Sequence, residues 1–202
     1  MAAELAVLTS LFVTNRDGSM TTANGSFREA RLVDVWLVIA LTGGACLVRA
    51  VGLLSERLWY DELLSVNFSN HGIVETFLTV ARFDVHPPLY YLQLCVWMLF
   101  GTSDEIVMAN SITWSVLTVA MVYFVGRFLA DRCAGDIAAG LVAVSPAVVF
   151  FSHQVRMYSF VSFLLVGAFF FMLRFLKSNR RRNLVAASLL ICAAAYSHAA
   201  GI

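Results

Sequence analysis

Long apolar stretches separated by short polar connections fill most of the chain. The first, residues 33–54, holds only Asp34 and Arg49 as charged residues, each close enough to an end for its side chain to reach the membrane surface. Four more stretches follow, at 106–125, 137–151 (extendable to Ala134), 158–173 and 184–200. Because a helix needs roughly 17–25 residues to cross a bilayer, the pattern predicts an all-α polytopic membrane protein with about five transmembrane helices.

The polarity returns between residues 55 and 105, which we interpret as one long external loop. Apolar residues at helical spacing from Ile73 to Ala81, with Glu75 and Arg82 on the opposite side, predict an amphipathic helix in the membrane interface. The apolar run from Pro87 to Gly101 is too short to span the hydrocarbon. We therefore expect a short in-plane or partly inserted helix there.

The positions of Lys and Arg give the orientation of the helices. Five spans with a cytoplasmic N-terminus place ten of the 14 basic residues inside: Arg16, Arg28, Arg31, Arg127, Arg132, Arg174, Lys177, Arg180, Arg181 and Arg182. A rival topology, with Pro87–Gly101 as a sixth span and the N-terminus outside, gives the same number. In the five-span topology the loop 55–105 shares the outer face with Arg156 and His198, whereas in the rival they lie on opposite faces.

The composition supports a membrane protein and excludes other classes. Hydrophobic residues make up 60% of the chain, charged residues 13%, and the mean hydropathy is +0.79. A net charge of +1 is too small for the positive electrostatic potential that attracts nucleic acid. The four Cys lack the spacing of metal ligands. Residues 1–31, rich in Ser, Thr, Asn and Gly, are interpreted as a disordered cytoplasmic tail, and residues 32–202 as the membrane domain.

The most polar interval of this apolar chain supplies the candidate catalytic residues. Asp61 and Glu62 follow an aromatic pair of the kind that settles at headgroup depth. A carboxylate at that depth meets both a lipid-borne and a water-soluble substrate. His86 precedes two prolines that end the same loop, and proline restricts the backbone of the residue before it.

Two further polar clusters fall at predicted helix ends. Arg156 and Tyr158 belong to the connection Ser152–Tyr158, where Arg156 stands on the face with few basic residues. Either the guanidinium binds a lipid phosphate, or it only reaches the interface beside Tyr158. His198 ends the motif Tyr196–Ser197–His198 at the outer end of the last helix.

Taken in order and spacing, these motifs resemble the multi-spanning glycosyltransferases of the C-type membrane fold, in the branch of protein O-mannosyltransferases that includes bacterial aminoarabinose and lipopolysaccharide-core sugar transferases. The resemblance covers residues 58–202. The motifs that carry it are Tyr60–Asp61–Glu62, His86–Pro87–Pro88–Leu89–Tyr90–Tyr91, Gly126–Arg127, Ser145–Pro146, Ser152–Tyr158 and Tyr196–Ser197–His198.

The resemblance implies transfer of a sugar, with inversion, from a polyprenyl-phosphate donor to a protein, lipid or glycan acceptor. The reaction would take place on the outer face of a bacterial plasma membrane. Asp61 would be the catalytic base, with Glu62 beside it in the catalytic motif and His86 in the loop that closes the site. Arg156, Tyr158 and His198 would bind the donor. Family members often carry an Arg in the stretch that corresponds to 104–110, which here has no basic residue, so either Arg156 or Arg82 would replace it.

Other functions stay open at this point. One alternative is a non-catalytic scaffold, which would keep Asp61 and Arg156 apart. Another is a truncated, inactive family member, which is considered because the chain stops directly after a helix. A transporter is disfavoured, since the charges gather at helix ends and not at their middles. No cofactor is implied with certainty. A divalent cation at Asp61, Glu62, His86 and His198 is possible, although no local ligand spacing indicates one.

Overall fold

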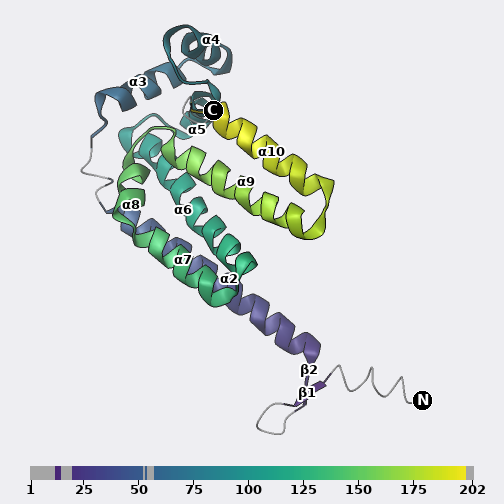
Figure 1. Ribbon diagram of the computed structural model, residues 1–202. Coiled ribbons are helices and arrows are strands. Elements are labelled where there is room, and N and C mark those ends of the chain that lie inside the picture. Colours follow the sequence, from purple (N-terminus) through teal and green to yellow (C-terminus); the bar gives the residue numbers. More distant parts are fainter. Residues whose placement is uncertain (1–11, 15–19, 52, 54–56, 199–202) are drawn as a thin grey trace. The chain divides into compact units, whose positions relative to one another are not determined.

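The computed structural model describes the backbone of residues 12–14, 20–51, 53 and 57–198, with side chains in these ranges from Trp36 onward. Helices form nearly all of it, which confirms the all-α fold (Figure 1). The elements are β1 (Phe12–Thr14), β2 (Met20–Thr22), α2 (Ala23–Ala50), α3 (Tyr60–Ser69), α4 (Ile73–Phe83), α5 (Leu89–Trp97), the 3-10 turn η1 (Met98–Phe100), α6 (Asp104–Leu129), α7 (Arg132–Val144), α8 (Pro146–His153), α9 (Tyr158–Ser178) and α10 (Arg181–Ala195).

The chain divides into two compact units, Met1–Ala40 and Leu41–Ile202. In the first unit β1 and β2 pair as an antiparallel hairpin, with Phe12 opposite Thr22. Helix α2 begins at Ala23, ten positions before the predicted start of the first span, and ends at Ala50. The tail assigned to residues 1–31 stays a prediction, because residues 1–11 and 15–19 lie outside the described part.

Two described helices, α6 and α9, are long and apolar enough to cross a membrane, and α7 with α8 makes a third candidate if the bent pair counts as one span. The described apolar part of α2, Trp36–Ala50, is shorter, and α10 has 15 residues. The chain is therefore a membrane protein by its apolar helices, while the count of five spans stays a prediction.

The segment predicted as one span over 137–151 is broken. Helix α7 ends at Val144, α8 begins at Pro146, and their axes differ by 55°. Proline has no N–H for a helical hydrogen bond and its ring clashes with the preceding turn, so it starts a new helix at its first position. The predicted span over 137–151 is therefore two helices with a bend between them, and whether the pair crosses the membrane as one span stays a prediction.

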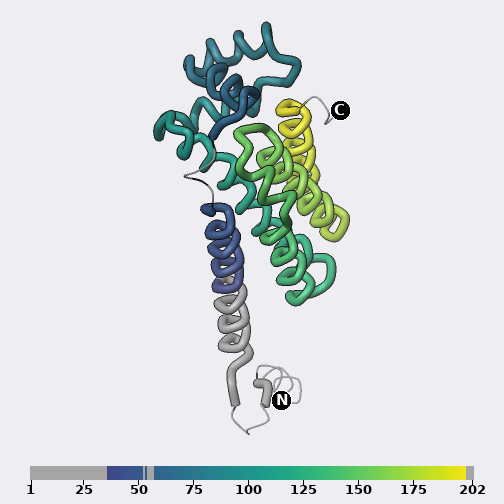
Figure 2. Tube along the Cα trace, turned by 90° about the vertical axis from the view of Figure 1, so that its left-hand side faces the viewer, coloured from purple at the N-terminus to yellow at the C-terminus, as the bar shows by residue number. Residues whose placement is uncertain are grey.

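The loop 55–105 is mostly helical in its described part, and its helices α3, α4 and α5 gather at one end of α6 and α9 (Figures 1 and 2). The predicted amphipathic helix is confirmed as α4. The run from Pro87 to Gly101 forms only α5 and the turn η1, in agreement with a helix too short to span. Gly101, with φ of 146°, ends this turn in a backbone conformation that other residues rarely adopt.

The main core lies between these helices and the bundle. Tyr91 and Leu94 of α5 are fully buried against Val107 of α6 and against Val155 and Met157 of the α8–α9 connection. A buried apolar cluster of this kind loses contact energy if any member shifts. The core therefore holds the connection 154–157 firmly beside α5 and α6.

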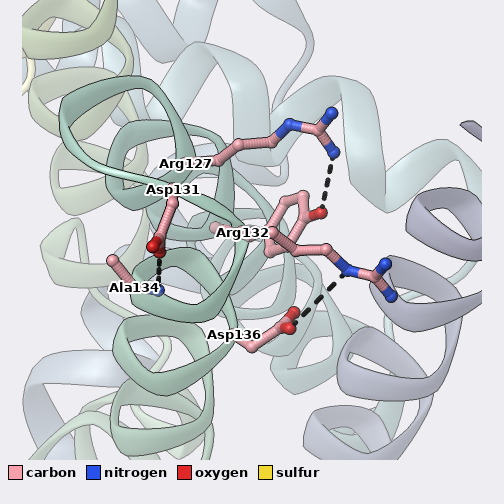
Figure 3. A network of polar contacts seen from close by, with 6 residues as sticks. Arg127, Asp131, Arg132, Ala134 and Asp136 are labelled. Carbon is pink, nitrogen blue, oxygen red and sulfur yellow. Dashed lines mark hydrogen bonds and ion pairs between the residues drawn. The ribbon is translucent and has the colours of Figure 1, made fainter. Parts of the chain in front are cut away.

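At the other end of α6, glycines allow the turn into α7. A Cβ added at Gly126 would lie 2.9 Å from the Ala134 carbonyl oxygen, and one at Gly135 would lie 2.8 Å from that of Tyr123. The Asp131 side chain caps α7 by accepting the Ala134 N–H at 2.9 Å (Figure 3). The Gly126–Arg127 motif thus marks a close backbone approach of α6 and α7.

Candidate functional site

The two carboxylates in the first turn of α3 have different environments. Glu62 is 4% exposed, and its oxygens accept the Trp59 N–H at 2.7 Å and the Val155 N–H at 2.9 Å. The first bond is one half of a capping box at the start of α3. The second ties α3 to a connection more than 90 positions away. Asp61 is exposed, and no described residue donates a hydrogen bond to its carboxylate.

Arg156, in the α8–α9 connection, contacts the first turn of α3. Its Nη1 lies 3.3 Å from the Asp61 carbonyl oxygen and 3.4 Å from Ser65 Oγ, which itself donates to the Asp61 carbonyl at 3.0 Å. The other guanidinium nitrogens of Arg156 make no hydrogen bond with the described residues. Arg156 and Asp61, predicted to share a face, therefore lie next to each other.

His86, His198 and Tyr158 form a second group. The ring centroids of His86 and His198 are 4.9 Å apart, and those of Tyr158 and His198 are 6.1 Å apart. The Leu89 N–H donates to the Tyr196 carbonyl at 3.1 Å, which fastens the end of α10 to the start of α5. Three loops distant in sequence thus meet at His198.

The electrostatics of His86 link the two groups. Burial lowers the pKa of His86 below its usual 6.5; Asp84 acts against this, and the charges of His198 and Arg156 add to it. The buried Nδ1 of His86 has no hydrogen-bond partner among the described residues. His86 is therefore a neutral imidazole near pH 7, close enough to Arg156 to feel its charge.

Asp84, which the sequence did not single out as a site residue, shapes this loop. Its carboxylate accepts the His86 N–H at 2.8 Å and the Tyr91 hydroxyl at 2.7 Å. An Asp that bonds the backbone N–H two positions later forms an Asx turn, and Pro87 restricts the backbone of His86. Asp two residues before His-Pro-Pro is the signal that would have identified it.

Arg82 lies apart from both groups. It is exposed on α4, with its guanidinium 6.0 Å from the Phe83 ring, and it lines a separate hollow with His71 and Glu75. None of its described contacts joins it to Asp61, Arg156 or His198.

An apolar cavity of about 520 Å³ lies between α6, α8 and α9 and reaches the second group. Tyr158 and His198 stand in its wall, and four hydroxyl side chains line it: Ser115, Thr118, Ser159 and Ser162. A mostly apolar pocket with a few polar groups is typical of a ligand site.

A protein-family model described as dolichyl-phosphate-mannose-protein mannosyltransferase matches residues 85–202, more than half of the chain. The chain belongs to this mannosyltransferase family. A search of curated proteins gave no match. His86, Arg156, Tyr158 and His198 lie within the matched range, whereas Asp61, Glu62 and Arg82 precede it. The chain is thus a mannosyltransferase-like membrane protein of the glycosyltransferase class.

The mannosyltransferase-like chain has a cation near the stretch that lacks the expected Arg. Arg57 lines a hollow of about 270 Å³ together with Glu62, Met108 and His153. The sequence placed Arg57 only among the charges of the long loop. That it lines one hollow with Met108, 51 positions away in sequence, depends on the tertiary structure, so no local motif could identify it.

The side chain of Arg49 lies in the protein interior. We expected its side chain to reach the membrane surface; instead it is fully buried. Its Nε donates to Ser115 Oγ at 2.9 Å, and its Nη1 donates to the carbonyl oxygens of Ala45 at 3.1 Å and Ala143 at 2.9 Å. Ala143 is in the last turn of α7, where carbonyls lack helical partners. Arg49 therefore closes the backbone at the α7–α8 break.

The main chain of Arg49 continues this network toward the site. Its carbonyl oxygen lies 2.7 Å from His153 Nε2, which must donate because a carbonyl only accepts. His153 ends α8, directly before the connection that carries Val155 and Arg156. Arg49 thus helps to hold the end of α8, next to the connection that carries Arg156.

The described residues of the mannosyltransferase-like chain contain no group of three or more His, Cys, Asp or Glu side chains placed to hold a metal ion. The structure pairs His86 with His198 and separates Glu62, which already binds two backbone N–H groups. The possible cation site at all four residues is therefore not assembled by the described contacts.

Proposed function

We propose that this protein transfers a sugar from a polyprenyl-phosphate donor to an acceptor hydroxyl on the outer face of the membrane, with inversion. The name of the matched family supports a dolichyl-phosphate-mannose-like donor and a protein acceptor. The observation that carries the proposal is the contact of Arg156 with the first turn of α3 at Asp61; Arg156 is two positions before Tyr158, which lies in the wall of an apolar cavity. This contact favours a transferase over the scaffold, which would keep Asp61 and Arg156 apart.

In the proposed step Asp61 is the general base. The acceptor oxygen forms a bond to the anomeric carbon while its proton passes to the Asp61 carboxylate. The bond from that carbon to the phosphate oxygen breaks, and its electron pair leaves with the phosphate. A phosphate needs no protonation to depart, so one carboxylate is enough, in contrast to the carboxyl pair of glycoside hydrolysis.

The surrounding residues have supporting roles in this proposal. The nitrogens of Arg156 that no described residue occupies suit the growing negative charge on the phosphate. Neutral His86, with His198 and Tyr158, would border the donor headgroup, and the cavity of about 520 Å³ would take the first prenyl units. Glu62 would hold the two loops together and not react, because both its oxygens bind backbone N–H groups.

The test of the base is the Asp61→Asn variant, assayed in membranes with a labelled polyprenyl-phosphate sugar. General-base catalysis contributes roughly 10²–10⁴-fold to a rate, so transfer should fall by about that factor. The matched control is Asp104→Asn in the first turn of α6, which should transfer at the wild-type rate. Full transfer by Asp61→Asn would remove Asp61 from the mechanism.

The proposed membrane side is tested with single cysteines in a Cys-free background. Asn70 and Ser103 are exposed and lie on either side of the segment from Pro87 to Gly101. Both Asn70→Cys and Ser103→Cys should react with an impermeant maleimide added from outside. Labelling from opposite sides would mean that the segment from Pro87 to Gly101 crosses the bilayer, and the topology would be wrong.

A further inference from the structure

A pocket of about 330 Å³ lies at the ends of α6 and α9, away from the Asp61 site. Its wall consists of Phe128 from α6, Arg174, Lys177 and Ser178 from α9, and Arg180 from the turn into α10. Figures 1 and 2 show this turn at the end of α9 opposite to α3–α5. Three of the five lining side chains are cations, and none is acidic.

The positive charge of this pocket is not compensated by the described residues. Arg174, Lys177 and Arg180 are exposed, and none of them forms an ion pair with a described Asp or Glu. The Lys177 Nζ lies 5.2 Å from the centre of the Phe128 ring, and the Arg174 guanidinium lies 5.7 Å from that of Phe170. Aromatic faces hold cations in place without neutralising them.

The cations are also not required to complete the end of α9. The Asn179 N–H, in a left-handed conformation with φ of 48°, donates to the Phe175 carbonyl at 2.7 Å. Ser178 Oγ donates to the Arg174 carbonyl at 2.6 Å and accepts from Asn183 Nδ2 at 3.0 Å. The chain therefore supplies its own cap, and the guanidinium and ammonium groups are left for another partner.

The position along α9 indicates where that partner lies. Helix α9 begins at Tyr158, beside the candidate site, and its 21 residues end at the pocket. At a rise of about 1.5 Å per residue this is about 30 Å, which equals the thickness of the hydrocarbon layer. With the start of α9 at one membrane surface, the pocket is at headgroup depth on the other surface.

We propose that this pocket binds the phosphate headgroup of an anionic phospholipid in the leaflet opposite the Asp61 site. A guanidinium fork and a compact ammonium group are the usual protein ligands of phosphate. Basic pockets between membrane helices suit such headgroups. The site does not depend on the glycosyltransferase reaction, since it uses none of its residues.

The test compares two double variants with the same loss of charge. Arg174→Gln with Lys177→Gln removes two cations that line the pocket, whereas Arg181→Gln with Arg182→Gln removes two exposed cations just beyond it. Native mass spectrometry of the purified protein counts phosphatidylglycerol adducts against phosphatidylcholine. The pocket variant should bind phosphatidylglycerol about tenfold more weakly or worse, and the control variant should stay within about twofold of the wild type.

Three results would contradict the proposal. If both double variants lost the same affinity for phosphatidylglycerol, binding would depend on the overall positive charge near the α9–α10 turn and not on the pocket. Equal binding of phosphatidylglycerol and phosphatidylcholine would remove the preference for an anionic lipid. Displacement of phosphatidylglycerol by about millimolar inorganic phosphate would assign the pocket to a free anion. Unchanged thermal unfolding of both variants in phosphatidylcholine excludes misfolding as the cause.

Discussion

The two ends of the helical bundle use polar side chains in different ways. Around Asp61, two polar contacts join residues far apart in sequence, Glu62 with Val155 and Arg156 with the Asp61 backbone, in addition to local contacts. The α6–α7 turn has local contacts such as Arg127 with the Tyr123 hydroxyl at 3.2 Å, four positions away (Figure 3). Long-range polar contacts assemble a site, whereas local contacts only finish a helix end.

A buried and a partly exposed arginine also differ in the sequence distance of their partners. Arg49 contacts Ser115 and Ala143, which are 66 and 94 positions away. Arg132 at the other end lies 3.9 Å from Asp136, a helical neighbour, with both side chains partly exposed (Figure 3). Exposed ion pairs contribute little to stability, but a buried hydrogen-bonded cation leaves unpaired partners when it is removed.

Arg49→Met should have the largest effect on stability. The Ser115 hydroxyl and the Ala143 carbonyl lose their buried donor, so the free energy of unfolding should fall by about 2–4 kcal/mol. The matched control, Arg181→Gln at the exposed start of α10, should change it by less than about 0.5 kcal/mol. Chemical unfolding in detergent micelles measures both. Similar values for the two variants would abolish the contrast between the two ends.

Glu62→Gln should have an intermediate effect. An amide has one acceptor oxygen, so it cannot accept both the Trp59 and the Val155 N–H, and one bond of about 1–3 kcal/mol is lost. Hydrogen exchange at the Val155 amide should become faster. Glu75→Gln on the exposed side of α4 is the control. If Val155 exchanges at the wild-type rate in Glu62→Gln, Glu62 does not tie the two loops.

The smallest predicted effect is the pH dependence that His86 adds. Its pKa in the folded protein is below 6.5, so as the pH falls through 6.5 the unfolded chain takes up a proton first and stability decreases. The unfolding temperature should drop by on the order of 1–3 °C between pH 7 and pH 5.5. His86→Gln should remove this part of the slope, and His71→Gln at an exposed turn should retain it. Equal slopes in all three proteins would contradict a partly buried, neutral His86.

Periodicity predicted the elements that depend on local sequence. The 26-residue and 21-residue helices α6 and α9 and the amphipathic helix α4 occur where apolar spacing indicated them. The apolar pattern did not show the break at Ser145–Pro146, because the helices on both sides of the bend are apolar. A window of hydropathy averages over one proline, whereas the backbone responds to its missing N–H.

Some candidate site residues were identified from the sequence, and others only from the structure. Asp61 and Arg156 were found from polarity in an apolar chain, because charge is costly in a membrane wherever it stands. The structure adds that Arg156 reaches the Asp61 backbone while Arg82 lies apart. It also adds Asp84 and Arg57, whose importance depends on neighbours that a single sequence cannot indicate.

The sequence by itself determined that this is an all-α membrane protein with its polar residues at helix ends, since hydrophobic length and the cost of buried charge act on every residue separately. Tertiary structure alone decided which polar groups meet: that Glu62 is engaged by two backbone N–H groups, that Asp61 stays open, and that Arg49 is buried. These outcomes depend on hydrogen-bond partners from distant parts of the chain, and only packing brings those partners within about 3 Å.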